Sequence, residues 1–170
     1  MARAKKPAKK AKKAKKPAKR KAPGREVPEA ALGRTETARW NVHLSFDGRC
    51  EEAFRFYVDC LGARINYMLA YGDSPMAGQV PEGFRRKILH GTLAMSGLVI
   101  TGADALPDEY RKPQGFAVLL QAGTKEEAER VFEKLSRGGA VSMPLQETFW
   151  TARFGMLVDL YGVPWIVQGR

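Results

Sequence analysis

The sequence has few of the residues that build disulfides, metal sites or membrane spans. It contains two cysteines and two histidines among 170 residues. Cys50 and Cys60 fall in one predicted helix, where about 15 Å of helix rise separates them, which is too far for a disulfide. Two reduced thiols are typical of a cytoplasmic protein. No apolar run approaches the roughly 20 residues that span a membrane, and we see no secretory or transit signal. We therefore expect a cytoplasmic protein without membrane contact.

Acidic residues are scarce only at the start of the chain. The net charge is +11, and residues 1–39 hold 15 basic and 3 acidic residues. The remainder holds 14 basic and 15 acidic residues, so it is close to neutral. Any attraction to polyanions is therefore expected from the N-terminal part alone.

The first residues consist of lysine pairs separated by alanine and proline. This composition predicts a disordered tail and linker over residues 1–38, followed by a folded domain over residues 39–170. The tail resembles those of linker histones and some bacterial nucleoid-associated proteins. We expect nonspecific contact with DNA or RNA phosphates, although a merely solubilising extension is the alternative. The side chains expected to make these contacts are Lys5, Lys6, Lys9, Lys10, Lys12, Lys13, Lys15, Lys16, Lys19, Arg20 and Lys21.

Hydrophobic periodicity predicts the order strand, helix, strand, strand, strand twice along the folded part. The first set is expected over Asn41–Phe46, Glu51–Leu61, Ala63–Ala70, Lys87–Met95 and Leu98–Thr101. The second is expected over Gly115–Gln121, a helix after Thr124, Ala140–Glu147, Phe154–Asp159 and Pro164–Gln168. Local signals support both helices, because Gly62 suits a C-cap and Thr124 with Glu127 suits a capping box.

Two short strings recur at matching places in the two sets. Glu51-Glu52-Ala53 returns as Glu126-Glu127-Ala128, and Leu61-Gly62-Ala63 is echoed by Gly138-Gly139-Ala140, at offsets of 75 to 77 residues. Two matches in register within one element order indicate a duplicated βαβββ module. The fold class predicted from these residues is α+β.

The strings NVHLSFDGRCEEAFRFYVDCLGA and QETFWTARFGMLVDLYGVPWIV resemble the PhnB-like branch of the vicinal oxygen chelate superfamily. That superfamily includes glyoxalase I, bleomycin-resistance proteins and extradiol dioxygenases. The resemblance covers about residues 40–169 and implies two βαβββ modules whose curved sheets enclose a cleft. It also implies a homodimer. It does not imply one activity, because this fold hosts lyases, epimerases, dioxygenases and binding proteins.

Catalytic members of this superfamily hold a divalent metal with His and Glu ligands from the first and last strands of each module. His43 lies at or beside the first such position. Thr101, Phe116 and the final strand offer no His or carboxylate at the other three. We therefore predict no cofactor and no metal site, with His43 as the ligand if a divalent metal does bind.

Several side chains are candidates for a ligand site in the cleft. His43 and His90 lie on predicted strands and are candidate general bases, although ordinary sheet histidines are the alternative. Glu147, Phe149, Trp150 and Arg153 surround one turn and suit a polar small molecule on an aromatic floor. Trp165 and Thr101 complete the expected ligand-binding set, whereas Asp159 is expected to hold the turn before Tyr161-Gly162.

Two functions remain open from the sequence. The first is a small-molecule-binding domain without the usual metal. The second is a glyoxalase-like lyase or isomerase, or a dioxygenase, that uses a divalent metal or a histidine base. Phosphate-loop, dinucleotide and serine-hydrolase motifs are absent, so we exclude those classes.

Overall fold

The structure is a computed structural model that describes residues 41–95 and 97–170. The first module contains β1 (Val42–Phe46), α1 (Cys50–Leu61), β2 (Arg64–Ala70), the 3-10 helices η2 (Tyr71–Asp73) and η3 (Glu82–Phe84), β3 (Ile88–Met95) and β4 (Leu98–Asp104). The second contains β5 (Val118–Ala122), α2 (Lys125–Leu135), β6 (Ala140–Gln146), β7 (Arg153–Val158) and β8 (Pro164–Gly169). The predicted tail and its lysines lie outside the described residues.

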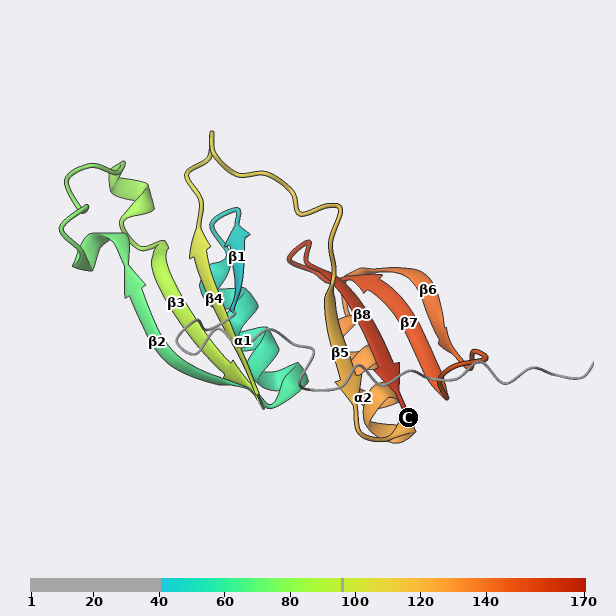
Figure 1. Ribbon diagram of the computed structural model, residues 1–170. Helices are drawn as coiled ribbons and strands as arrows, with labels where there is room; N and C mark the ends of the chain where they lie inside the picture. Colours follow the sequence, from blue (N-terminus) through green and yellow to red (C-terminus); the bar gives the residue numbers. More distant parts are fainter. Residues whose placement is uncertain (1–40, 96) are drawn as a thin grey trace, which may run out of the picture. The chain divides into compact units, whose positions relative to one another are not determined.

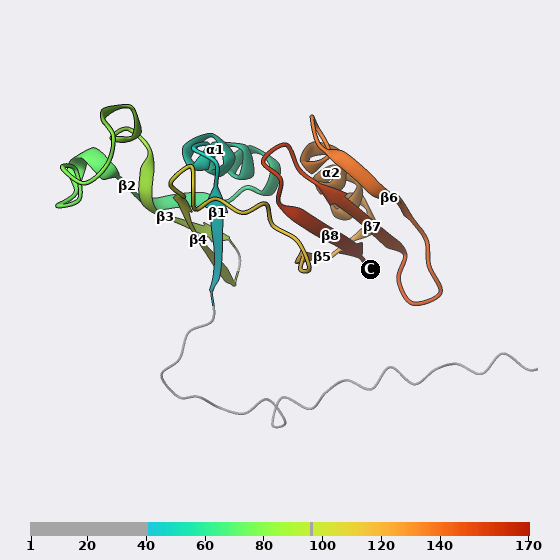
Figure 2. The same ribbon diagram turned by 90° about the horizontal axis from the view of Figure 1, so that it is seen from above.

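Each module folds into its own four-stranded mixed sheet (Figure 1), in the orders β1-β4-β3-β2 and β5-β8-β7-β6. The first and last strands of each module pair in parallel, as β1 with β4 and β5 with β8, and the other neighbours pair antiparallel. Figure 2 shows that each helix lies against one face of its own sheet. The predicted α+β fold of two βαβββ modules is confirmed.

Glycines let each helix approach its sheet closely. Gly91 and Gly102 are paired on β3 and β4, and a Cβ at these positions would lie 2.9 Å and 2.7 Å from the ring of Phe54. Phe54 is fully buried on α1. Against α2, a Cβ at Gly155 would lie 2.6 Å from the ring of Phe132. In both modules, therefore, a strand glycine leaves room for a phenylalanine ring of the helix to pack directly on the sheet.

The ends of both helices follow their sequence signals. Gly62 caps α1 in the left-handed region, with φ of 66°. The Thr124 hydroxyl accepts a hydrogen bond from the Glu127 amide at 3.2 Å, and the Glu127 carboxylate accepts one from the amide of Gly123 at 2.9 Å. The predicted starts of both helices therefore hold to within one residue, and the reciprocal arm of the capping box reaches one residue earlier than expected. The second helix was expected to end at Gly138-Gly139, and it ends earlier, at Leu135.

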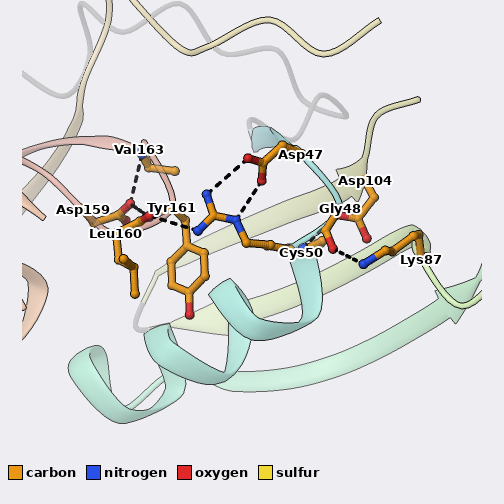
Figure 3. Close-up of polar contacts among 10 residues, drawn as sticks. Asp47, Gly48, Cys50, Lys87, Asp104, Asp159, Leu160, Tyr161 and Val163 are labelled. Atoms are coloured by element: carbon orange, nitrogen blue, oxygen red, sulfur yellow. Dashed lines mark hydrogen bonds and ion pairs between the residues drawn. The ribbon is translucent and has the colours of Figure 1, made fainter. Parts of the chain in front are cut away.

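Two predicted strand ends differ from the structure by more than one residue. The last strand of the first module continues beyond Thr101 to Asp104, and the first strand of the second module begins at Val118 rather than Gly115. Asp104 prolongs β4 because its buried carboxylate accepts hydrogen bonds from the amides of Cys50 and Ile88, both at 2.8 Å. Figure 3 shows Asp104 beside Cys50 at the start of α1. A residue from β4 thus caps α1, whose own N-cap residue makes no side-chain cap.

The two modules contact each other through α1, α2 and the turn between β7 and β8. The Tyr57 hydroxyl on α1 donates to the Asp159 carboxylate at 2.7 Å, and Lys134 Nζ on α2 donates to the Asp59 carbonyl at 2.8 Å. Arg49 donates to the Leu160 carbonyl at 3.3 Å and lies over the Tyr161 ring. These contacts join the modules on the helix side of the sheets.

Both cysteines are free and buried on α1. None of the helices in the described residues is long and apolar enough to cross a membrane.

Candidate functional site

A row of hydroxyl and imidazole side chains crosses the first sheet on the face turned away from α1. The strand register aligns His43 with Thr101, Thr101 with Thr92, and Thr92 with Tyr67. Residues of the opposite face, such as Leu44, Leu93 and Ile100, are fully buried against α1. We call the first set the His43 row and its face the first open face. The row joins four strands because side chains at paired positions point to the same side of a sheet.

His90 lies on the same face, beside the His43 row. It precedes Thr92 by two residues on β3 and pairs with Leu69 on β2. Its Nε2 lies 3.4 Å from the Thr92 hydroxyl, and its ring centroid lies 6.3 Å from that of Tyr67. His43 and His90 are both exposed. The two histidines singled out in the sequence therefore share one face.

The surroundings of His43 favour a neutral imidazole. Its Nδ1 lies 2.9 Å from the Thr101 hydroxyl, which also donates to the Val42 carbonyl at 3.4 Å. Partial burial of the ring, and after it the nearby His90, lower the pKa of His43 from its ordinary value of 6.5. A neutral imidazole offers one N–H and one lone pair, so it can accept a proton or a hydrogen bond at neutral pH.

The second sheet has an open face of a different character. The register aligns Leu119 with Ile166 and Met156 in one row, and in the next it aligns the residues Gln121, Gln168, Phe154 and Gln146. Leu119 is 51% exposed. These registered positions carry amide and apolar side chains and no ionisable group. We call this the second open face.

The residues at the ligand positions of the superfamily do not fit its metal. On the open faces, the first and last strands present His43 and Thr101 in one module and Leu119 and Ile166 in the other. Phe116 was expected at the third position, but it precedes β5. One imidazole and one hydroxyl do not make the set of His and carboxylate ligands that holds a divalent transition metal. The described residues contain no group of three or more His, Cys, Asp or Glu placed to hold one.

Aromatic side chains gather at the turn between β6 and β7. The Phe149 and Trp150 ring centroids lie 4.4 Å apart, and those of Trp150 and Phe154 lie 5.5 Å apart. Phe149 is 92% exposed and Trp150 is 52% exposed. We call these three residues the aromatic tip. Large exposed apolar groups that cluster in this way mark a surface for a ligand or a partner.

Glu147 and Arg153 do not act as a pair beside this tip. Glu147 is exposed, whereas the Arg153 guanidinium turns to α2 and donates to Glu129 at 2.7 Å. Arg153 pairs with Gly169 on the side of the sheet that α2 covers. The expectation that Arg153 orients a ligand over Trp150 is therefore wrong, because strand alternation directs the Arg153 side chain to the face of the sheet that α2 covers.

Trp165 also lies on the covered side. It is 1% exposed, and its indole Nε1 donates to the Asp159 carboxylate at 2.8 Å. Its ring packs against Tyr57 with centroids 5.5 Å apart. The expectation of a ligand contact from Trp165 is corrected accordingly, and Ile166 is the residue of this strand on the open face.

Asp159 holds the turn before β8, as expected. Its carboxylate accepts hydrogen bonds from the amides of Tyr161 at 2.9 Å and Val163 at 3.0 Å (Figure 3).

The two cysteines are poor nucleophiles, because burial raises the pKa of both thiols and brings that of Cys60 to about 11. A neutral, buried thiol reacts slowly.

Tyr67, Thr92 and Ser45 were not singled out from the sequence. The available signal was alternation, because Thr92 lies two residues from His90 and Ser45 two residues from His43. The register was needed to bring Tyr67 beside them, since it depends on a bulge between Ile65 and Tyr67. The His43 row belongs to the first module, whereas the aromatic tip belongs to the second.

Comparison with known proteins gives the following relatives. A family model described as 3-demethylubiquinone-9 3-methyltransferase matches residues 38–168. Protein YjdN of Escherichia coli is 34% identical over 134 residues, which cover 74% of this chain and 91% of that protein.

Solved structures of similar proteins cover the same region. The structure of PA1353 from Pseudomonas aeruginosa is 37% identical, with a TM-score of 0.69, and the match covers 78% of this chain and 98% of that one. A PhnB protein from Bacillus cereus is 26% identical, with a TM-score of 0.67 and coverages of 78% and 100%. The fosfomycin resistance protein FosX of Listeria monocytogenes, complexed with Mn(II) and a dihydroxypropylphosphonic acid, is 12% identical with a TM-score of 0.56 and coverages of 79% and 93%. At that identity FosX shows likeness of fold alone.

Proposed function

The chain belongs to the PhnB-like family of the vicinal oxygen chelate superfamily, and from this premise we propose that its folded part binds a small molecule without the usual His/Glu metal. The observation that carries the proposal is the His43 row, a set of hydroxyl and imidazole groups on a sheet face that no helix of the module covers. In ligand sites a small number of placed polar groups fix the orientation of the bound molecule.

The polar contacts of the site would come from His43, Thr101 and His90. Apolar contact would come from Phe149 and Trp150 of the aromatic tip, which are too exposed to serve as core. The donor set favours a binding role over metal-centred catalysis, because the four superfamily positions supply one nitrogen and no carboxylate.

A ligand screen tests the binding role. Thermal shifts of the full chain against a metabolite library should yield compounds that raise Tm, since a ligand that binds only the native state stabilises it. The same compounds should stabilise Arg55→Ala, a matched change on the outer surface of α1, and fail to stabilise His43→Ala. Hits that stabilise His43→Ala and Trp150→Ala as much as the wild type would contradict the proposed site.

Metal content tests the second half of the proposal. Elemental analysis and calorimetry should find no stoichiometric nickel, zinc, manganese or iron in the purified chain. A tightly held metal that is lost in His43→Ala would overturn the assignment and make lyase, isomerase and dioxygenase screening the next step.

A homodimer would complete this site. The His43 row lies on the first sheet, whereas the aromatic tip lies at the turn between β6 and β7 of the second, whose open face exposes Leu119 and Met156. A second copy would bring its aromatic tip to the His43 row and cover these apolar side chains. Light scattering should give twice the chain mass, and Trp150→Ala should weaken both dimer and ligand binding. A monomer that binds ligand with full affinity would contradict the shared site.

An enzyme that uses His43 as a metal-free general base is the second candidate. The lowered pKa of His43 supports it, because the unprotonated imidazole is then present at neutral pH. A pH–rate profile that falls with protonation of His43 and is abolished in His43→Ala would establish it. Methyl transfer has no such support, since β1 is followed by the short loop Asp47–Arg49 rather than a glycine-rich nucleotide loop.

The lysine-rich N-terminal segment would bind DNA or RNA without sequence preference. The sequence supports this through charge density and the lack of aromatics in the lysine repeats. Binding should weaken steeply with salt and vanish when residues 1–38 are removed. Persistence of binding by residues 39–170 would contradict a role of the tail.

A further inference from the structure

The first open face carries little permanent charge. Among the described residues that the register places on it, the permanently charged side chain is Arg64, which pairs with Ala94 on β3. Its guanidinium donates to the Asn66 side chain at 3.0 Å. Arg64 is on β2 and His43 on β1, at opposite edges of the sheet. Three strand spacings of about 4.8 Å put them roughly 14 Å apart, beyond the Debye length of about 8 Å at physiological salt.

An anionic ligand head would therefore lack a cation beside the His43 row. A carboxylate or phosphonate bound beside the row would lose part of its hydration without gaining a paired cation, which is unfavourable. The charge of this face thus favours an uncharged ligand.

The hydrogen bonds of Thr101 assign a role to each nitrogen of His43. The Val42 carbonyl, 3.4 Å from the Thr101 hydroxyl, can only accept, so both contacts of this hydroxyl are hydrogen bonds only when its one proton goes to that carbonyl. The hydroxyl must then accept the Nδ1–H of His43 across the 2.9 Å contact. In the neutral ring this leaves Nε2 with a lone pair and no proton. The tautomer is assigned from this order of donors, and it makes Nε2 a hydrogen-bond acceptor for whatever lies above the face.

The side chains around the His43 row are short, so they protrude little from the first open face. Val99 and Thr101 on β4 pair with Ala94 and Thr92 on β3, and Ser45 pairs with Ala103. Short side chains at these positions leave a shallow floor, which a flat molecule can contact across several strands. Tyr67 and His90, with rings tilted by 46° to each other, form one side of the floor.

We propose that the first open face takes a flat, uncharged molecule that presents an O–H or N–H donor to Nε2 of His43. This inference rests on the proposed small-molecule function and adds the chemical class of the ligand. Thr101 acts as a positioning residue, since it holds the tautomer that exposes the lone pair.

Three naphthalene probes with one aromatic body test the class. These are 2-naphthol, which is uncharged and has a donor, 2-methoxynaphthalene, which is uncharged and lacks one, and 2-naphthoate, which is anionic. Each is titrated into the full chain at about pH 7.5, where the naphthol stays protonated, and followed by NMR through the imidazole C–H signals of His43 and His90. Naphthol should bind about tenfold more tightly than either analogue, the effect of one hydrogen bond.

Variants separate the donor from the aromatic body. His43→Ala should abolish the preference for naphthol over 2-methoxynaphthalene, and Arg64→Ala, a matched change on the same face, should leave it unchanged. In the free protein, imidazole nitrogen-15 shifts should report the Nδ1–H tautomer. Thr101→Val should convert His43 to a tautomer mixture and reduce the preference, a readout that loss of stability alone would not give.

Each contrary result has a distinct meaning. Tightest binding of 2-naphthoate, lost in Arg64→Ala, would overturn the uncharged class and leave small-molecule binding at this face intact. Equal binding of naphthol and 2-methoxynaphthalene, or an Nε2–H tautomer in the free protein, would overturn the donor requirement. If none of the probes shifts the signals of His43, the assigned class is wrong, and the library screen on wild type and His43→Ala decides the proposed function separately.

Discussion

Replacing Asp159 with asparagine should cost this protein a large share of its stability. One carboxylate oxygen accepts the amides of Tyr161 and Val163, and the other accepts the Tyr57 hydroxyl at 2.7 Å and the Trp165 indole at 2.8 Å. The carboxylate is 4% exposed. Asparagine keeps one acceptor oxygen and replaces the other with an NH₂ group, which faces two donors.

The expected loss follows from these two contacts. A hydrogen bond to a charged group contributes about 1.5–3 kcal/mol, and a buried donor left unpaired costs about 1–3 kcal/mol. The Tyr57 hydroxyl can rotate and accept, but the Trp165 N–H cannot, so we expect a loss of about 3–5 kcal/mol. A typical small domain is stable by about 5–15 kcal/mol.

Urea unfolding of the full chain, followed by tryptophan fluorescence, measures this loss. With an m-value of about 1–3 kcal/mol/M, the midpoint should fall by about 2 M. Tyr57→Phe should cost about 1–2 kcal/mol, and the double variant should cost less than the sum because the two groups share one bond. A loss below about 0.5 kcal/mol for Asp159→Asn, or strict additivity with Tyr57→Phe, would refute the role of this carboxylate in joining the modules.

Three further outcomes are expected. Gly102→Ala should destabilise by about 1–3 kcal/mol through overpacking against Phe54, whereas Gly83→Ala, where a Cβ meets nothing within 4 Å, should be nearly neutral; equal losses in urea unfolding would contradict the close helix–sheet contact. The NMR titration midpoint of His43 should lie below 6.5. The folded state then binds the His43 proton more weakly than the unfolded state, so the free energy of unfolding should fall as the pH drops from 6.5 through this midpoint, and His43→Gln should reduce that fall. A midpoint above 6.5 would contradict the described surroundings of His43. Cys60, whose pKa burial raises to about 11, should resist iodoacetamide in the native protein and react after unfolding, as followed by mass spectrometry; rapid native alkylation would contradict its burial.

Part of the candidate site was visible in the sequence. His43, His90 and Thr101 were singled out, and the structure brings them to one face. Arg153 and Trp165 were expected beside a ligand and lie on the covered side instead. A strand shows its two faces in its sequence as alternation, but alternation does not say which face a helix covers when both faces carry large side chains.

Local chemistry determined the elements of this protein. Gly62 ends α1 because glycine, which lacks a Cβ, adopts the left-handed conformation without steric strain, and Thr124 begins α2 because its hydroxyl pairs with an amide that the helix leaves free. The repeated strings are visible in the sequence alone, and they indicate that the module is duplicated. These features depend on neighbours within a few residues along the chain.

Tertiary structure alone decided which of these residues meet. The carboxylate of Asp104 caps a helix that starts 54 residues earlier, and Asp159 reaches Tyr57 across 102 residues. The His43 row exists because the pairing of four strands sets its register, and a shift of one residue would turn each side chain to the other face. Such long-range pairing is decided by the burial of the whole core, so the sequence could name His43 and Thr101 while their neighbours Thr92 and Tyr67 came only from the fold.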